Sequence, residues 1–374
     1  METNISGKHF PMTLANRTVA LAVADTGFLF LINIAALFGN IILCVAFVKN
    51  NHLRLATNIL VFALAACDII MAFLAMPLSE VSLIAGKWIL GDHLCHIQGL
   101  LVHFLAFLSL QIMALTAINR YFRVIKPRFY RKVFTPFHTT LMIAVTSVLC
   151  FVALASVTFG QHNSFVFHPG KVICVTLHEN IFSSQVFTTF SSVAFVFLPA
   201  CVVIWCYTKV FRAIRRHFRQ LASRRVSTVS LNNLTPAEIV VTRNVFAIVL
   251  AFFICWIPCI VIDIVDVMRD EWFDRQVYLA YTYFAYTSSA INPFIYGVLN
   301  RSFRVEYLKL LRCRWSSFQR RKVGSYRYLN DGFTYVSKRH NSGRRKLNAN
   351  EHRFMSKRNN HLYKSQSSVM WYVL

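Results

Sequence analysis

Seven long stretches of the chain are almost entirely apolar, and short polar segments separate them. A bilayer core about 30 Å thick needs about 20 apolar residues in each crossing helix, and every stretch reaches that length. The segments between them contain the Lys, Arg, Pro, Gly and Asn clusters that are typical of loops. The predicted spans are Thr26–Val48, Thr57–Leu83, Leu94–Ile118, Thr139–Phe159, Phe182–Tyr207, Val240–Val267 and Val277–Leu299. The pattern predicts an all-α membrane protein, a seven-transmembrane helix bundle.

The composition supports a membrane protein and excludes two other classes. Hydrophobic residues make up 56% and charged residues 15% of the chain, whereas a soluble domain has roughly 25% charged residues. This apolar fraction excludes a disordered chain and exceeds what one soluble core could bury. The formal net charge is +25, but no nucleic-acid-binding motif accompanies it. We therefore expect the basic segments to contact anionic membrane lipid and no nucleic acid.

Basic residues are concentrated on one side of the predicted bundle. Most of the 40 Lys and Arg lie in the loops after spans one, three and five and in the tail after span seven. Because cytoplasmic segments carry the excess of basic residues, we predict a multi-pass plasma-membrane protein with its N-terminus outside and its C-terminus cytoplasmic. The glycosylation acceptors Asn4 and Asn16 then lie outside.

The same patterns divide the chain into four parts. These are an extracellular segment (1–25), the helix bundle (26–299), an amphipathic helix on the inner surface (300–313) and a basic, disordered cytoplasmic tail (314–374). Apolar residues recur at helical spacing in the third part, with basic residues on the opposite face, which is typical of a helix lying on a membrane.

Polar side chains inside apolar spans are costly and are therefore candidates for function. Asp68 lies in the middle of the second span. Its available partners in other spans are Asn40, Ser109, Ser288 and Asn292. A carboxylate among hydroxyl and amide oxygens, without a basic partner, is typical of a hard-cation site. The alternative is a protonated Asp that is hydrogen-bonded for packing.

Seven motifs in order along the spans resemble those of the rhodopsin-like (class A) G-protein-coupled receptors. They are Gly39-Asn40, Leu64-Ala65-x-x-Asp68, Trp88 before Cys95, Asn119-Arg120-Tyr121, Pro199 with Tyr207, Phe252-x-x-x-Trp256-x-Pro258, and Asn292-Pro293-x-x-Tyr296 followed by Phe303. The resemblance covers the chain from Asp25 to Cys313. It implies a receptor that binds an extracellular small molecule or peptide within the bundle and activates a heterotrimeric G protein. Arrestin and receptor kinases are implied as further partners.

Within this family the pattern is most similar to melatonin-like receptors. Asn119 replaces the Asp that usually precedes the motif Arg, as in melatonin receptors, and Tyr296-Gly297 is shared with them. Pro293 departs from that pattern, as does the lack of an Asn near the outer end of span four, so a melatonin-like ligand is kept only as an alternative. Val102 stands where amine receptors have an Asp, and Tyr286 stands where opsins have the retinal-binding Lys.

The resemblance also implies roles for individual residues. Cys95 and Cys174 match the family disulfide, and Cys313 matches a palmitoylation site. Asp68, with Ser109 and Asn292, is predicted to bind Na⁺ as an allosteric ion; no other cofactor is expected. The predicted polar core is Asn40, Asp68, Ser109, Trp256, Ser288 and Asn292.

The inner half of the bundle is predicted to couple to the G protein. The residues assigned to activation and coupling are Asn119, Arg120, Tyr121, Tyr207, Glu238, Pro258, Pro293 and Tyr296. Asn119 cannot form the ion pair with Arg120 that an Asp would form. We therefore predict that Glu238 restrains Arg120 in the resting state. The alternative is that Glu238 is a solvated helix-start residue favoured by the helix dipole.

A ligand pocket is predicted above Trp256. Its candidate lining residues are Val102, His103, Ala106, Ser191, Ser192, Trp256, Cys259, Asp263, Tyr283 and Tyr286. His103 is interpreted as a pocket or packing residue rather than a base. Asp263 lies about two turns beyond Trp256 on an acidic outer face, so the ligand is predicted to be cationic or a strong hydrogen-bond donor. Alternatively, Asp263 ends the helix in water or pairs with Lys171 or Arg269 from the loops.

Three other classes of function share some of these features or must be compared with them. A transporter or channel could use buried Asp68 and the prolines that interrupt four spans, but the halves of the chain show no internal repeat. A constitutively active receptor would share all the motifs above. An enzyme is not expected, since the sequence shows no metal-ligand or nucleophile cluster.

Overall fold

The computed structural model describes residues 4–5, 8–9, 17–49, 55–159, 164–177, 181–222, 236–268, 273–299 and 304. All of them lie in one unit, Met1–Arg314. Three predictions fall outside the described residues: the site at Asn16, the amphipathic helix apart from Arg304, and Cys313 with the tail. At Asn4 only the backbone is described.

Seven helical segments correspond to the seven predicted spans. They are α1 (Val19–Lys49), α2–η3–α3 (Ala56–Ile70, Met71–Ala75, Met76–Ala85), α4 (Asp92–Ile125), α6 (Pro136–Phe159), α7–η4–α8 (Ile181–Ser191, Ser192–Phe197, Leu198–Ala222), α9 (Pro236–Met268) and α10 (Arg275–Leu299). Within the described residues, six of these are long and apolar enough to cross a membrane. The other is α10, whose polar residues lower its hydropathy; Thr282, Ser288 and Asn292 are buried against other helices.

The helices extend past the apolar stretches that predicted them. The first begins at Val19 rather than Thr26, and α8 continues to Ala222, well beyond Tyr207. Apolar length indicates how much chain lies in hydrocarbon, whereas backbone hydrogen bonding can continue into water beyond it. The sequence therefore located the spans and underestimated the helix lengths.

Two of the four span prolines follow widened turns. The π-helical segments η3 and η4 immediately precede the helices that begin at or near Pro77 and Pro199. Proline has no N–H and its ring crowds the preceding turn, and a π-helical turn accommodates this. Pro258 and Pro293 instead lie inside the continuous helices α9 and α10.

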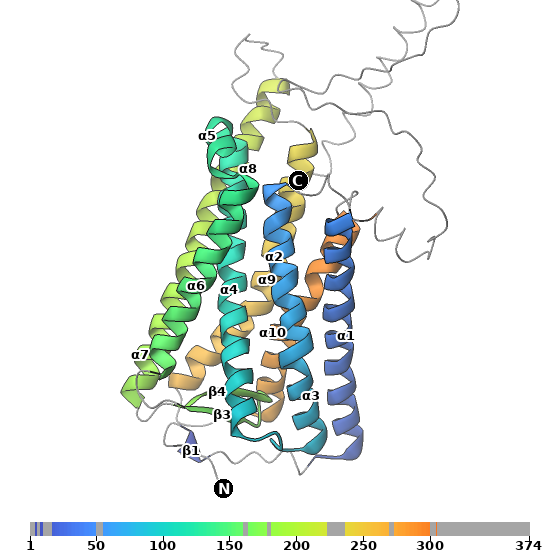
Figure 1. The fold of residues 1–374 in the computed structure, drawn as a ribbon, viewed down its shortest axis with the longest axis vertical. Coiled ribbons are helices and arrows are strands. Elements are labelled where there is room, and N and C mark those ends of the chain that lie inside the picture. Colours follow the sequence, from blue (N-terminus) through green and yellow to red (C-terminus); the bar gives the residue numbers. More distant parts are fainter. Residues whose placement is uncertain are drawn as a thin grey trace, which may run out of the picture. The chain divides into compact units, whose positions relative to one another are not determined.

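Helix α4, which is the third span, is central to the bundle. It contacts α2, α6, α8 and α9, while α10 packs against both α1 and α9. Figure 1 shows the long helices running side by side, with the β3–β4 hairpin at one end and the short helix α5 at the other. We name these ends the outer end and the inner end after the orientation that the sequence predicts. The main apolar core lies between these helices and includes Leu64, Leu110 and Phe252.

Several loop segments have structure that the apolar pattern did not predict. Helix α5 (Pro127–Val133) begins at a proline, a favoured first helical residue, and its Tyr130 is buried. Strands β1 (Asn4–Ile5) and β2 (Lys8–His9) pair near the N-terminus. Strands β3 (Ser164–His168) and β4 (Ile173–Leu177) form an antiparallel hairpin, with Ser164 opposite Leu177 and His168 opposite Ile173.

Candidate functional site

A small cavity lies in the middle of the bundle, between α2, α4, α9 and α10. Its volume is about 20 Å³, room for about one water-sized particle. The lining residues are Cys67, Asp68, Met71, Val102, Leu105, Ala106, Ser109, Phe252, Trp256, Ala285, Tyr286, Ser288 and Ser289. The cavity thus brings predicted pocket residues and predicted polar-core residues together at one place.

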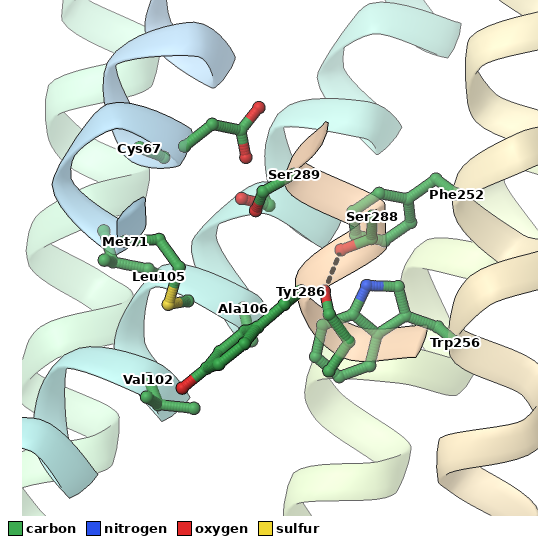
Figure 2. A pocket seen from close by; sticks show the side chains of 13 residues that line it. Cys67, Met71, Val102, Leu105, Ala106, Phe252, Trp256, Tyr286, Ser288 and Ser289 are labelled. Carbon is green, nitrogen blue, oxygen red and sulfur yellow. Dashed lines mark hydrogen bonds between the residues drawn. The ribbon is translucent and has the colours of Figure 1, made fainter. Parts of the chain in front are cut away.

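The polar wall of this cavity, on the side of the inner end, is centred on Asp68. The side-chain amide of Asn292 donates to Asp68 Oδ2 at 2.9 Å. Asn40 donates to the backbone oxygen of Ser289 at 3.0 Å, which ties α1 to α10. Ser288 donates to the backbone oxygen of Ala285 at 2.6 Å, shown dashed in Figure 2. A carboxylate, hydroxyl groups and a small enclosed space are therefore adjacent here, as a hard-cation site requires.

Trp256 and Tyr286 form the other wall. Figure 2 shows the indole nitrogen of Trp256 facing Ser288, and the Tyr286 ring extending from α10 toward Val102. Trp256 Nε1 is buried, and it has no hydrogen-bond partner among the described residues. An unpaired buried donor is costly, so this N–H is available to a guest molecule in the cavity.

A chain of hydrogen bonds connects this wall to the outer hairpin. The Tyr286 hydroxyl lies 2.9 Å from Ser79 Oγ, and Gln98 donates to Ser79 Oγ at 3.0 Å. Gln98 Oε1 in turn accepts the backbone N–H of Cys174 at 3.1 Å. Sequence reasoning missed Ser79 and Gln98. A signal was available, because Gln98 lies one helical turn after Cys95 and therefore points in a similar direction.

The hairpin is fixed to the outer end of α4. A disulfide joins Cys95 to Cys174 with a Cα–Cα distance of 5.5 Å. Phe165 of β3 packs directly on α4 at Gly99, where a Cβ atom would lie 2.1 Å from the Phe165 ring. Only glycine allows this close approach, so the α4 sequence provides the surface on which the hairpin lies.

The hairpin turn pairs with the acid that was predicted to anchor a ligand. Lys171 Nζ lies 2.7 Å from Asp263 Oδ1, and Tyr281 donates to Asp263 Oδ2 at 3.2 Å. The Tyr278 hydroxyl donates to Asp266. Of the two alternatives for Asp263, the structure therefore has the pairing with Lys171. The carboxylate is not an unpaired anchor.

His168 lies next to this ion pair. Its Nδ1 accepts the backbone N–H of Lys171 at 3.1 Å, and its ring centroid lies 4.7 Å from that of Tyr278. Burial, and then the nearby Lys171 charge, hold the pKa of His168 well below its usual range. A ring that accepts at Nδ1 and is buried beside a cation is neutral near pH 7.

Three other predicted pocket residues have partners away from the cavity. The Tyr283 hydroxyl donates to the backbone oxygen of Asp25 at 3.1 Å, so this side chain points toward α1. The Cys259 thiol contacts the Tyr281 backbone oxygen at 3.4 Å, between α9 and α10. His103 Nδ1 lies 2.7 Å from the Gly99 backbone oxygen, as a packing histidine would.

The serines predicted on the fifth span differ in burial. Ser191 is buried and Ser192 is partly buried. Ser191 Oγ has no hydrogen-bond partner within the described part of the chain. Like Trp256 Nε1, it is a buried polar atom without a partner there, but Ser191 does not line the central cavity.

At the inner end, Arg120 is buried and its partners are neutral. It donates to Asn119 Oδ1 at 2.8 Å and to Thr57 Oγ1. Thr57 also donates to Asn119 Oδ1 at 2.9 Å. Asn119 and Thr57 therefore bind Arg120 through hydrogen bonds to neutral groups. The three residues form a polar cluster that connects α2 with α4.

Glu238 pairs with a different arginine from the one predicted. Arg123 Nη2 lies 2.8 Å from Glu238 Oε1, and Arg123 Nε donates to the same oxygen at 3.0 Å. The prediction of an Arg120–Glu238 pair is wrong, because Arg120 points toward α2 while Arg123, one helical turn further on, reaches α9. The ion pair still joins the third and sixth spans.

Aromatic residues surround the inner arginines. Tyr207 is buried against Phe246, with ring centroids 5.1 Å apart, and its hydroxyl has no partner in the described ranges. Tyr121 contacts Trp205 at 4.9 Å, and Tyr296 is buried. Of the tyrosines assigned to coupling, Tyr207 and Tyr296 are therefore buried at this end and Tyr121 is partly buried.

Comparison with known proteins gives the family. The sequence matches the 7 transmembrane receptor (rhodopsin family) over residues 39–296. It is 27% identical to melatonin receptor type 1B of Mus musculus over 283 residues, 75% of each chain. It is 25% identical to 5-hydroxytryptamine receptor 4 of Cavia porcellus over 320 residues, 79% of this chain and 81% of that one.

A third relative has a similar degree of sequence identity. The human histamine H2 receptor is 26% identical over 302 residues, 79% of each chain. The three relatives are named for different ligands, so the likeness identifies the receptor class and leaves the ligand to the site itself. With its seven helical segments, its outer disulfide and a match over most of its length, this chain belongs to the rhodopsin family of seven-transmembrane G-protein-coupled receptors.

Proposed function

We propose that this receptor binds its extracellular ligand above Trp256 and transmits the signal to a G protein at the inner ends of α4, α8 and α10. The observation that carries the proposal is the unpaired, buried indole N–H of Trp256 beside the central cavity. The same cavity is also lined by Asp68, which accepts a hydrogen bond from Asn292 in the inner half of α10. Ligand contact with this wall would change the relative stability of two bundle states.

The test measures G-protein activation without a known ligand. The receptor is expressed with each Gα class in turn, and nucleotide exchange is compared with that of Arg120→Ala at equal surface level. Arg131→Ala, in an exposed position of α5, is the matched control. We expect at least one Gα to respond to the wild type and the control and not to Arg120→Ala. Equal exchange in all three for every Gα would contradict the proposal.

We also propose that the central cavity binds Na⁺ at Asp68, with oxygens from Ser109 and Asn292. The supporting features are the buried carboxylate, its hydroxyl neighbours and a volume suited to one small particle. Replacing NaCl with choline chloride should lower the melting temperature of the purified wild type and leave Asp68→Asn unaffected. The same sodium-dependent shift in both proteins would refute the site.

The orientation proposed for the chain places the hairpin outside and α5 in the cytoplasm. The excess of basic residues on the α5 side supports it. Arrestin, receptor kinases and anionic lipid are proposed partners of that basic face. An epitope tag at the N-terminus should bind antibody on intact cells, and a tag at the C-terminus should bind only after permeabilisation.

A further inference from the structure

The outer end of the bundle is partly filled by the chain's own hairpin turn. Lys171 and Val172, between β3 and β4, are both buried. We propose that this turn is a built-in occupant of the ligand site: Lys171 fills a cation site whose anion is Asp263, and an external ligand brings an ammonium-type cation that replaces it. This inference rests on the receptor function proposed above and specifies the charge of its ligand.

The groups around the Lys171 ammonium are those that recognise an organic cation. Asp263 Oδ1 lies 2.7 Å from Nζ. The Tyr281 ring centroid lies 4.6 Å from Nζ and the Tyr278 ring centroid 5.8 Å. A carboxylate with aromatic faces around it attracts ammonium groups through charge and through the ring quadrupoles. The site is built from α9 and α10, whereas α4 has Val102 where amine receptors carry their Asp.

The two partners differ in their access to solvent. The Lys171 side chain is 9% exposed, whereas the Asp263 side chain is 37% exposed. An incoming cation can therefore approach the carboxylate from outside while Lys171 is still bound. A pair whose acid is partly hydrated costs less to open than a fully buried pair. The arrangement favours exchange of one cation for another.

The hairpin turn packs closely against α10 and against the hairpin itself. The Lys171 backbone N–H is bound by His168, and its backbone oxygen accepts from Thr282 of α10. At Gly170 a Cβ atom would lie 2.8 Å from Tyr278. Val172 has a φ of +54°, which is unfavourable for a β-branched residue and persists only where packing holds it. Lys171 is therefore placed at Asp263 by several independent contacts.

The packed hairpin turn occurs together with an ion pair at the inner end. The same structure holds the Lys171–Asp263 pair outside and the Arg123–Glu238 pair inside, both with α9 as one partner. A contact that is present in one bundle state and lost in the other stabilises the first. Lys171 therefore stabilises the resting state, and its replacement by a free cation releases α9 from the hairpin.

The experiment removes the internal cation and supplies a small external one. The variants are Lys171→Ala, which vacates the site, and Lys171→Met, which keeps the side-chain stem without the charge. Lys87→Ala, at an exposed lysine of the loop before α4, is the matched control. The probes are propylammonium chloride and the neutral propanol at millimolar concentration. The measurements are ligand-independent G-protein activation and the melting temperature of the purified full chain.

We expect Lys171→Ala and Lys171→Met to raise basal activation about fivefold or more, the range of typical coupling between sites, and Lys87→Ala to leave it unchanged. Propylammonium should raise the melting temperature of Lys171→Ala, propanol should not, and Lys171→Ala/Asp263→Asn should respond to neither. A Lys171→Met protein with wild-type activity and melting temperature would overturn the inference. So would equal effects of propylammonium and propanol on Lys171→Ala.

Failure of the proposed function gives a different result. If no variant activates any Gα, the receptor function proposed above fails in this assay. The propylammonium-specific melting shift in Lys171→Ala still reports the cation site by itself, and its absence there overturns the inference.

Discussion

Helix α9 is held by an ion pair at each end, and the two pairs are of different kinds. At the outer end, buried Lys171 meets Asp263 beneath a disulfide-linked hairpin, with two tyrosines against the ammonium. At the inner end, Arg123 and Glu238 have side chains that are 42% and 22% exposed. Exposed pairs contribute only about 0–1 kcal/mol, whereas an ammonium group left in a buried position without its partner costs several times more.

The difference indicates which end can open at low cost. The inner end is closed by a weak, hydrated contact, as a surface that must admit a protein partner requires. The outer end is fastened by a covalent bond, a fitted turn and a buried hydrogen-bond chain. We therefore expect perturbations at the outer end to lower the stability of the receptor strongly, whereas perturbations of the inner ion pair should leave its stability nearly unchanged.

The largest effect should come from breaking the disulfide. Cys174→Ser frees the hairpin from α4, and loss of a native disulfide typically costs about 2–5 kcal/mol. We expect surface display, measured by antibody binding to intact cells, to fall sharply. Cys201→Ser, at an exposed free cysteine, is the control and should be displayed normally. Normal display of Cys174→Ser would show that the outer end does not depend on the bridge.

A smaller effect is expected from filling the contact between α4 and β3. In Gly99→Ala the added methyl group meets the Phe165 ring, and overpacking of this kind costs about 1–3 kcal/mol. The melting temperature of the purified receptor should fall by several degrees. Gly27→Ala, where a Cβ atom meets nothing within 4 Å, should not lower it. Unchanged melting of Gly99→Ala would mean that the hairpin can shift at little cost.

Acid should loosen the outer end through His168. The pKa of His168 is lowered by burial in the seated hairpin, so the released hairpin takes up a proton first, from about pH 6.5 downward. The packing of the hairpin against the bundle is thus most stable above that pH. Below it, the free energy of this packing weakens by at most about 1.4 kcal/mol per pH unit. The other charged or titratable groups that face the ring are Lys171 and Tyr278, with Asp263 and Asp266 behind them.

The measurement is the melting temperature between pH 7.5 and 5.5. His168→Asn keeps a hydrogen-bond acceptor for the Lys171 N–H and removes the titrating ring. We expect it to lose part of the pH dependence that the wild type shows below pH 6.5. Identical slopes for both proteins would exclude His168 as the source.

The smallest energetic effect should come from the inner pair. Glu238→Gln removes an exposed ion pair worth about 0.2–1 kcal/mol, and it should raise basal G-protein activation by at most about fivefold while the melting temperature hardly changes. Arg123→Gln should do the same, and the double variant should add little. A large loss of stability in Glu238→Gln would abolish the contrast between the two ends.

The sequence by itself determined the seven spans and the position of the polar core. Both depend on local properties: apolar length sets a transmembrane helix, and Asp68 was notable because a carboxylate in an apolar span is expensive. Its hydrogen bond to Asn292 agrees with the set of partners expected for it. The motif resemblance added the cysteine pair that the structure joins.

Only the tertiary structure decided which charges meet. Lys171 and Asp263 are 92 residues apart, and Arg123 and Glu238 are 115 residues apart. Arg120 and Arg123 lie one helical turn apart on α4, so sequence spacing could not choose between them, and Tyr283 points to α1 rather than inward. Local hydropathy fixes which segments enter the membrane, whereas side-chain pairing depends on how each helix is rotated and on where a loop of unpredicted conformation folds back.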